Sequence, residues 1–400
     1  MLKMNNQHST KYLVLCAVLF VIHLFFLKGL TAQNEGVPFQ VQPGLFDHSM
    51  PGTLGLSFAP QAETATIFSP GEHENHYNHA VALMPFRGQL YVQWQTSARD
   101  EDAPDTHVVY SRSTNGKDWT APMVLAPKRE KGIVTSGGWW TDGEVLVGYL
   151  CVWPELFEGE KQGYTEYIIS TDGINWSEPK PVLDSEGRPL KGIFEQDPHA
   201  LPDGRIINPV HKQPGLVATP YYTDDPKGIA GWTKGKMQNL PFDGTISREL
   251  EPSWFYRSDS AVVMVFRDQG SSYRQLASVS NDRGESWTQP TLVNMPDSRA
   301  KQSAGNFPDG TAFLVNNPTG SKQRYPLVLA LSKDGHLFDR AFLVRAEADK
   351  QPLRFDGRYK REGYSYPKSV VWNEYLYIGY ATNKEDIELT RIPWENLVEE

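Results

Sequence analysis

Four short segments of the chain share one pattern: a serine, a turn rich in Asp, Asn and Gly, and an aromatic residue at the end. They lie at residues 113–119, 170–176, 280–287 and 332–338, and we call them turn boxes. In such a turn the Asp or Asn side chain accepts backbone N–H bonds and Gly supplies a positive φ. The aromatic ring packs beneath the turn. Four copies in one chain predict a repeat architecture.

The spacing of the boxes indicates what repeats. Their starts are 57, 110 and 52 residues apart, and the middle interval is about twice the others. It predicts one further unit near residue 225 that has lost its box. A period of roughly 50–55 residues suits four antiparallel strands with their connections, which is one blade of a propeller. The chain beyond residue 40 holds about six such units. We therefore predict an all-β fold, a six-bladed β-propeller with four-stranded antiparallel blades.

The segments between the boxes agree with strands. Short runs rich in aromatic and β-branched residues lie at 89–94, 145–150, 261–266 and 375–380. No long stretch shows helical periodicity. A β-sandwich of similar strand density is the alternative, but it does not predict a repeat of this length.

The first 32 residues differ from the rest. Lys3 and Lys11 precede an apolar run at 12–27, and cleavage is expected after Ala32, as in a secretory signal peptide. The protein is then secreted or periplasmic. The apolar run is also long enough for an uncleaved membrane anchor, which stays the alternative. Residues 33–65 are predicted to be a lead-in segment or the strand that closes the ring, and 66–400 the propeller.

Removal of the leader leaves Cys151 as the single cysteine, so no intramolecular disulfide can form. An exported protein of this kind is stabilised by its core. Loss of the three leader lysines changes the formal net charge from −9 to −12, and no basic run remains. This charge argues against nucleic acid and anionic membranes as partners. We expect a monomer without a cofactor whose partner is a glycan.

In a propeller the turn boxes all lie on one face, so chemistry is expected on the other, where the inner strands converge on the central channel. Five residues are candidates to project there. They are Asp102 in Asp102-Ala-Pro, Glu251 and Arg267 sixteen positions apart, Arg324 before the fourth box, and Tyr364 in Tyr364-Ser365.

With these residues in this order, the sequence resembles the sialidase superfamily, most closely the secreted bacterial exo-sialidases, over residues of about 70 to 380. The resemblance implies that Tyr364 is the nucleophile, that Glu251 activates it and that Asp102 is the acid/base. It also implies that Arg267 and Arg324 clamp a substrate carboxylate. The implied activity is removal of a terminal acidic sugar with retention of configuration.

The residue types suit that reaction. A sugar with a carboxylate at its anomeric carbon repels a carboxylate nucleophile, so a neutral Tyr hydroxyl is preferred, and sialidases are known exceptions to the rule of two carboxylates. Glu251 would take the Tyr364 proton. Asp102 would protonate the leaving oxygen and then activate water. Arg267 and Arg324 would bind a carboxylate in bidentate fashion.

One position departs from the family pattern. Sialidases carry a third clamp Arg near the start of the first blade, and here Asn78 or His79 stands in its place. Loss of such a charge-assisted pair is expected to cost about 1.5–3 kcal/mol of substrate binding. The departure puts N-acetylneuraminic acid in doubt and suggests another ulosonic acid, a uronic-type acid, or a plant or algal sugar.

Histidines leave further alternatives open. His73, His76 and His79 could be metal ligands, polar residues of the pocket or part of a solvated loop; their spacing is not that of a helical zinc site, and we predict no metal. His199 and His211 could also reach the channel. Together with Tyr364 and a clamp Arg, they would suit a polysaccharide lyase, in which a base removes the proton beside a uronate carboxylate.

Two further residues are substrate-binding candidates. Trp140 could stack on a sugar or pack in the core, and Asp197 precedes His199 in the chain. A glycan-binding propeller without activity is the third alternative. The presence of Asp102, Glu251 and Tyr364 together favours an enzyme, since binding alone does not need all three.

Overall fold

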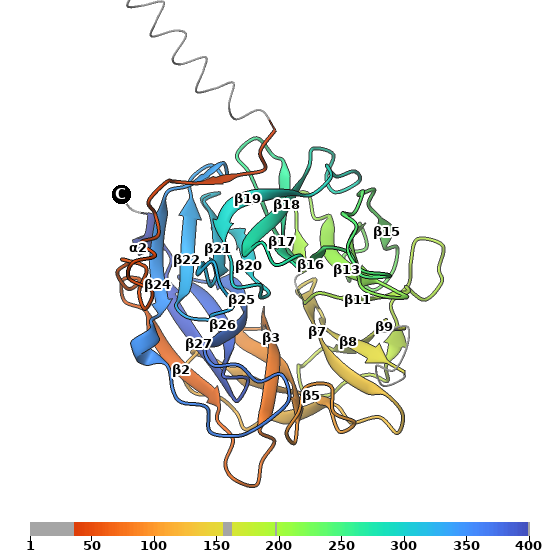
Figure 1. The fold of residues 1–400 in the computed structure, drawn as a ribbon. Coiled ribbons are helices and arrows are strands. Elements are labelled where there is room, and N and C mark those ends of the chain that lie inside the picture. The colour runs from red at the N-terminus through yellow and green to blue at the C-terminus, as the bar shows by residue number, and fades with distance from the viewer. Residues whose placement is uncertain (1–35, 155–161, 197, 399–400) are drawn as a thin grey trace, which may run out of the picture. The chain divides into compact units, whose positions relative to one another are not determined.

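The computed structural model describes residues 36–154, 162–196 and 198–398. Six antiparallel sheets surround a central channel, which confirms the predicted six-bladed β-propeller (Figure 1). The predicted leader lies outside the described residues. Within the described ranges, we find no helix whose length and apolar character would let it cross a membrane.

The blades are numbered in chain order, and the strands of each blade are given from the innermost outward. The first holds β3 (Tyr77–Phe86), β4 (Gln89–Ser97), β5 (His107–Ser113) and β6 (Met123–Ala126). The second holds β7 (Ile133–Thr141), β8 (Leu146–Trp153), β9 (Tyr164–Ser170) and β10 (Lys180–Pro181). The third holds β11 (Gly192–Phe194), β12 (His199–Ala200), β13 (Ile206–Lys212), β14 (Val217–Thr223) and β15 (Thr233–Lys234). Both β11 and β12 pair with β13, so together they form the innermost position.

The fourth blade holds β16 (Glu249–Tyr256), β17 (Val262–Asp268), β18 (Arg274–Ser280) and β19 (Thr291–Pro296). The fifth holds β20 (Ser303–Asn306), β21 (Ala312–Asn316), β22 (Leu327–Ser332) and β24 (Arg340–Arg345). The sixth holds β25 (Tyr364–Trp372), β26 (Tyr375–Thr382), β27 (Asp386–Pro393) and, outermost, β2 (Glu63–Phe68). Short elements complete the chain: β1 (Gln40–Val41), β23 (Leu337–Phe338), a 3₁₀ turn at Glu347–Asp349 and α2 (Glu395–Val398).

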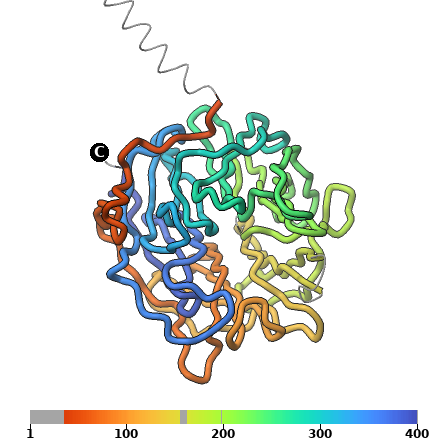
Figure 2. The backbone as a smooth tube through the Cα atoms, in the orientation of Figure 1, coloured from red at the N-terminus to blue at the C-terminus, as the bar shows by residue number. Residues whose placement is uncertain are grey.

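The ring closes by pairing the two ends of the chain. Strand β2 lies antiparallel to β27 and supplies the outer strand of the last blade. Before it, β1 pairs with β23 and Phe58 bridges Leu343, so this N-terminal segment runs along the fifth blade (Figure 2, red against blue). This pairing completes the sixth blade with a strand from the start of the propeller, and each blade keeps only a short outer edge.

The core lies between adjacent blades, where alternate side chains of neighbouring sheets interdigitate. Large rings such as Trp94, Trp139 and Trp254 are fully buried there, among Val, Ile and Leu. The aromatic and β-branched runs seen in the sequence thus supply the apolar area that holds the blades together.

Each turn box connects the third and fourth strands of its blade. In the second box Asp172 Oδ1 accepts the N–H groups of Ile174 and Asn175, both within 2.9 Å. The third blade has a longer form of the same turn, in which Asp225 accepts the N–H groups of Ile229 and Ala230. This turn starts at Thr223, 53 residues after the second box, which is where the sequence predicts a unit without a box. Because the strands are antiparallel, the connections between second and third strands and those between blades emerge on the opposite face.

Candidate active site

A cavity of about 970 Å³ opens at the central channel on the face away from the boxes, lined by side chains of five blades and by Lys301 from the segment before the fifth blade. The cavity is therefore where the loops between second and third strands and the connections between blades meet.

The innermost strands share a feature that shapes this cavity. In five blades the innermost strand is interrupted by one residue with a positive φ. These residues are Ala80 (59°), Gly138 (92°), Gln196 (67°), Glu251 (52°) and Tyr366 (55°). At four of these places the strand register shifts, as in a β-bulge. Bulges turn a side chain out of the regular alternation, and strained residues of this kind cluster at functional sites. All but Gly138 line the cavity.

Two of these bulges, in the fourth and sixth blades, bring Glu251 and Tyr366 together. The Tyr366 hydroxyl donates a hydrogen bond to Glu251 Oε1. Arg267 Nη1 lies 2.7 Å from Glu251 Oε2 and donates to the Tyr366 oxygen at 3.1 Å. A phenol, a carboxylate and a guanidinium thus form one closed triangle at the wall of the cavity.

The charges in the triangle set its protonation. Burial alone would raise the pKa of Glu251, but the charges of Arg267 and Lys301 outweigh it and lower the pKa. Burial and the Glu251 charge raise the pKa of Tyr366 above 10. At neutral pH the resting state is therefore a neutral phenol beside an ionised carboxylate, with Glu251 in position to receive the phenol proton.

Arg324 reaches the same tyrosine from the loop between β21 and β22. Its guanidinium carbon lies 5.3 Å from the centre of the Tyr366 ring, and Nη1 donates to Ser365 Oγ at 2.8 Å. The residue is buried, its Nε has no hydrogen-bond partner, and no carboxylate of the described ranges forms an ion pair with it. A buried cation without a counter-charge is costly, and an anionic ligand would supply one.

Asp102 lies in the loop between β4 and β5 and lines the cavity. This loop is anchored to the sixth blade: Arg358 N donates to Asp100 Oδ1 at 2.7 Å, and Lys384 Nζ lies 2.5 Å from Glu101 Oε2. These contacts tie the loop that carries Asp102 to the part of the chain that carries Tyr366.

Comparison with known proteins places the chain in a family. The family model described as BNR repeat-like domain matches residues 88–378. The chain belongs to the family of BNR repeat-like domains. A search of the curated proteins gave no match.

Solved structures share the propeller of this BNR repeat-like protein. The Hadza microbial sialidase Hz136 is 14% identical, with a TM-score of 0.64, over 83% of this chain and 68% of that one. The intramolecular trans-sialidase from Ruminococcus gnavus, in complex with oseltamivir carboxylate, is 13% identical, with a TM-score of 0.62, over 87% and 99%. A protein of unknown function from Dyadobacter fermentans is 15% identical, with a TM-score of 0.63, over 83% and 99%. At these identities the likeness shows the fold, and it confirms the sialidase-like propeller expected from the sequence.

The prediction that Tyr364 is the tyrosine of the site is wrong. Its side chain is fully buried in the core of the fifth and sixth blades, and its hydroxyl donates to the Ala346 carbonyl oxygen at 3.0 Å. It does not line the cavity, and Tyr366 occupies the position expected for it. The bulge at Tyr366 separates the directions of two side chains that a regular strand would send to the same face.

Of the two residues in place of the third clamp Arg, Asn78 is structural. Its amide donates to the carbonyl oxygens of Asn75 and Glu385, and its Oδ1 accepts from Trp94 Nε1. His79 lines the cavity, with its ring centre 4.3 Å from that of Tyr366. Burial, and then the Lys384 and Arg324 charges, lower the pKa of His79 well below 6.5, so this position carries a neutral ring.

The histidines of the predicted metal alternative do not converge. His76 stacks on Phe355 with ring centres 3.8 Å apart, and His73 is exposed, while His79 is buried in the cavity wall. No group of three His, Cys, Asp or Glu in the described ranges has the arrangement of a metal site.

The remaining candidates divide between two cavities. His211 lines the main cavity, together with three residues that sequence reasoning missed: Glu195, Gln196 and Lys301. Trp140 and His199 line a separate space of about 280 Å³, and Trp140 Nε1 donates to the Pro226 oxygen. Asp197 lies outside the described residues. The missed residues carried no motif, since they meet only because the blades close into a ring.

Proposed function

We propose that this protein is an exo-glycosidase that removes a terminal acidic sugar from glycans with retention of configuration, with Tyr366 as its nucleophile. The observation that carries the proposal is the triangle in which the Tyr366 oxygen lies between the carboxylate of Glu251 and the guanidinium of Arg267. A phenol held in this way can lose its proton only as it reacts, because its pKa is raised in the resting site.

In the first displacement the Tyr366 oxygen forms a bond to the anomeric carbon and its proton passes to Glu251. Arg267 Nη1, 3.1 Å from that oxygen, stabilises the negative charge that develops there. Asp102 donates a proton to the glycosidic oxygen as the bond to the leaving group breaks. The product of this step is a glycosyl–tyrosine bond and a free alcohol.

In the second displacement the ionised Asp102 takes a proton from water, whose oxygen bonds to the anomeric carbon. The bond to Tyr366 breaks, and the phenol oxygen recovers its proton from Glu251. Two displacements at one carbon return the sugar with its original configuration. Every group is then in its starting state.

The environment of Arg324 supports the proposal that the substrate is an acidic sugar. Its charge is buried beside Tyr366 without a carboxylate partner among the described residues, whereas Arg267 and Lys301 are each paired with a glutamate. Neutral His79 lines the wall where a third clamp Arg is expected, so a substrate carboxylate meets no third guanidinium there. We therefore propose a substrate class that includes sialic acid, other ulosonic acids and uronic-type sugars.

The lyase remains a second candidate because of one contact. The neutral ring of His79 packs against Tyr366, and a base and a phenol side by side are the groups that β-elimination from a uronate uses. His211 does not fill the base role, since both its ring nitrogens are engaged.

A panel of aryl glycosides carrying sialyl, other ulosonyl, uronyl and neutral sugars tests the proposal. We expect hydrolysis of at least one acidic member, with nuclear magnetic resonance showing that the first-formed sugar keeps its anomeric configuration. Inversion would exclude a Tyr366 nucleophile. Ultraviolet absorbance from an unsaturated uronate would establish the lyase, and glycan binding without turnover would establish the binding module.

We also propose that the protein is exported, on the strength of its leader sequence. N-terminal sequencing of the mature protein from the cell envelope or the medium is expected to start after Ala32. An intact N-terminus in the membrane fraction would establish the anchor instead.

A further inference from the structure

The backbone of Glu251 is held at both ends by side chains of other blades. Glu251 has a φ of 52°, in the left-handed region. Its N–H donates to His211 Nε2 at 3.1 Å, and its carbonyl oxygen accepts from Gln302 Nε2 at 3.0 Å. The first contact comes from the third blade and the second from the segment before the fifth. A strained peptide persists only where its surroundings fix it, and these two contacts do so.

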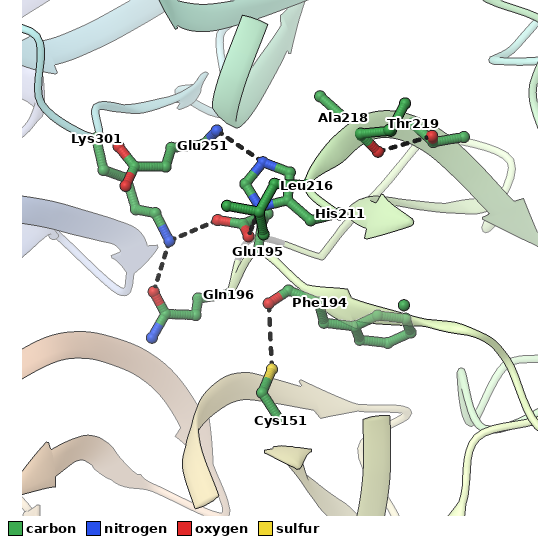
Figure 3. Close-up of polar contacts among 12 residues, drawn as sticks. Cys151, Phe194, Glu195, Gln196, His211, Leu216, Ala218, Thr219, Glu251 and Lys301 are labelled. Atoms are coloured by element: carbon green, nitrogen blue, oxygen red, sulfur yellow. Dashed lines mark hydrogen bonds and ion pairs between the residues drawn. The ribbon is translucent and has the colours of Figure 1, made fainter. Parts of the chain in front are cut away.

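His211 is itself fixed by a buried ion pair. Its Nε2 accepts the Glu251 N–H, so the ring proton is on Nδ1, which donates to Glu195 Oε1 at 2.5 Å. Glu195 Oε2 lies 2.7 Å from Lys301 Nζ, which also donates to Gln196 Oε1 at 2.9 Å. Figure 3 shows this row of contacts running from Gln196 through Lys301, Glu195 and His211 to the Glu251 amide.

This row of contacts is buried, and its geometry suits a structural role in holding Glu251 better than a role in proton transfer. The side chains of His211 and Glu195 are each 5% exposed, and that of Lys301 7%. A buried ion pair adds little stability compared with an apolar pair of the same size, because of the cost of desolvation. None of the proposed proton transfers passes through it. Its hydrogen-bonded link to the reacting groups is the contact of His211 with the Glu251 amide, while the Lys301 charge acts on the Glu251 pKa.

We propose that His211, held in one tautomer by Glu195 and Lys301, is a positioning residue that keeps Glu251 in its strained bulge and so directs the carboxylate at the Tyr366 hydroxyl. This inference rests on the proposed function. It adds to the groups that touch substrate a set of positioning contacts from the third blade and from the segment between the fourth and fifth blades.

The test compares His211→Leu with His211→Gln. Leucine removes both contacts, whereas the glutamine amide can accept the Glu251 N–H and donate to Glu195 at once. We expect His211→Leu to lower kcat by about 100-fold on the acidic glycoside, the loss that a misplacement near 1 Å can cause, with KM changed less than threefold. His211→Gln should recover at least a tenth of the wild-type kcat. His336→Leu, in the fourth box on the other face, should match the wild type.

A crystal structure of His211→Leu gives a readout that does not need turnover. We expect the Glu251 φ to leave the left-handed region and its carboxylate to leave hydrogen-bond distance of Tyr366. If the wild type hydrolyses no glycoside, the proposed function fails while this structural test still decides the inference. An unchanged Glu251, or equal kcat in the wild type and His211→Leu, would overturn it. If His211→Leu does not fold, Gln302→Met, which removes the carbonyl contact, takes its place with the same two readouts.

Discussion

The hydroxyl of Tyr366 donates its hydrogen bond to Glu251 Oε1, and the same oxygen accepts one from Arg267 Nη1 at 3.1 Å. The phenol therefore has its proton acceptor and its charge stabiliser in place before substrate arrives. The two residues that form the pair are 115 positions apart and sit at bulges of the fourth and sixth blades. The chemistry of the site depends on how these two strands are bent.

The first prediction separates the two neighbouring tyrosines. Tyr366→Phe removes the nucleophilic oxygen and is expected to lower kcat on the acidic glycoside at least 1000-fold, about 4 kcal/mol in activation free energy. Tyr364→Phe should keep kcat within about threefold, since its hydroxyl only bonds Ala346, and lose about 0.5–1.5 kcal/mol of unfolding free energy. Steady-state kinetics and urea unfolding measure both. Loss of turnover in Tyr364→Phe with retention in Tyr366→Phe would reverse the assignment.

These tyrosines also show how far the sequence alone could go. The boxes have a fixed composition and spacing, so they predicted the number of blades, and the resemblance carried by Glu251, Arg267 and Arg324 predicted side chains that point toward the channel. The choice between Tyr364 and Tyr366 depends on a bulge, which leaves no residue-type signature. In a regular strand both side chains would point to one face.

The fourth blade contains a second pair of like residues that a bulge separates. Glu249 and Glu251 are also two positions apart, yet Glu249 is buried against Leu240 N and Asn239 Nδ2, and only Glu251 lines the cavity. The Glu195–Lys301 pair escaped prediction for another reason, since its partners come from separate blades and carry no motif. The position of a bulge and the contacts between distant blades depend on the folded structure, so the pattern of residues along the chain did not predict them.

The second prediction concerns Asp102. If this side chain protonates the leaving oxygen, Asp102→Asn should slow natural glycans with poor leaving groups by 100- to 10,000-fold, the usual contribution of about 10²–10⁴ from general acid catalysis. Aryl glycosides whose leaving group needs no proton should keep their first displacement within about tenfold of the wild type. Burst kinetics with a nitrophenyl glycoside measure this step separately. Equal losses on both substrate types would remove Asp102 from the acid role.

The third prediction tests the acidic sugar through Arg324. Arg324→Met retains the buried methylene stem but removes the charge, and it should raise KM for an acidic glycoside by about 10- to 100-fold, from a charge-assisted bond of about 1.5–3 kcal/mol. Turnover of a neutral glycoside should not change. Arg205→Met is the matched control, because Arg205 is also largely buried but pairs with Asp224 and Glu285 away from the cavity. An equal rise in KM for acidic and neutral sugars would show that Arg324 acts on the shape of the site.

The fourth prediction is a pH dependence of stability that comes from Asp297. This carboxyl is buried in the segment that joins the fourth and fifth blades, with Arg299 N donating to Oδ2 at 2.8 Å, and burial raises its pKa from 3.8 to about 7. Between these two values the folded state binds a proton that the unfolded state has released, so the free energy of unfolding falls as pH rises from about 4 to 7. The shift corresponds to a loss on the order of 4 kcal/mol.

Asp297→Asn keeps the shape and removes the titration. Urea unfolding at pH 4 and pH 8 should therefore show a variant close to the wild type at the lower pH and more stable by up to about 4 kcal/mol at the higher one. Asp339→Asn, at an exposed position of the fifth blade, should follow the wild type at both. Identical pH profiles for the wild type and Asp297→Asn would mean that Asp297 is ionised in the folded protein. Its negative charge would then reach Arg267, whose own pKa it helps to raise, and would weaken the field that Arg267 applies to Tyr366.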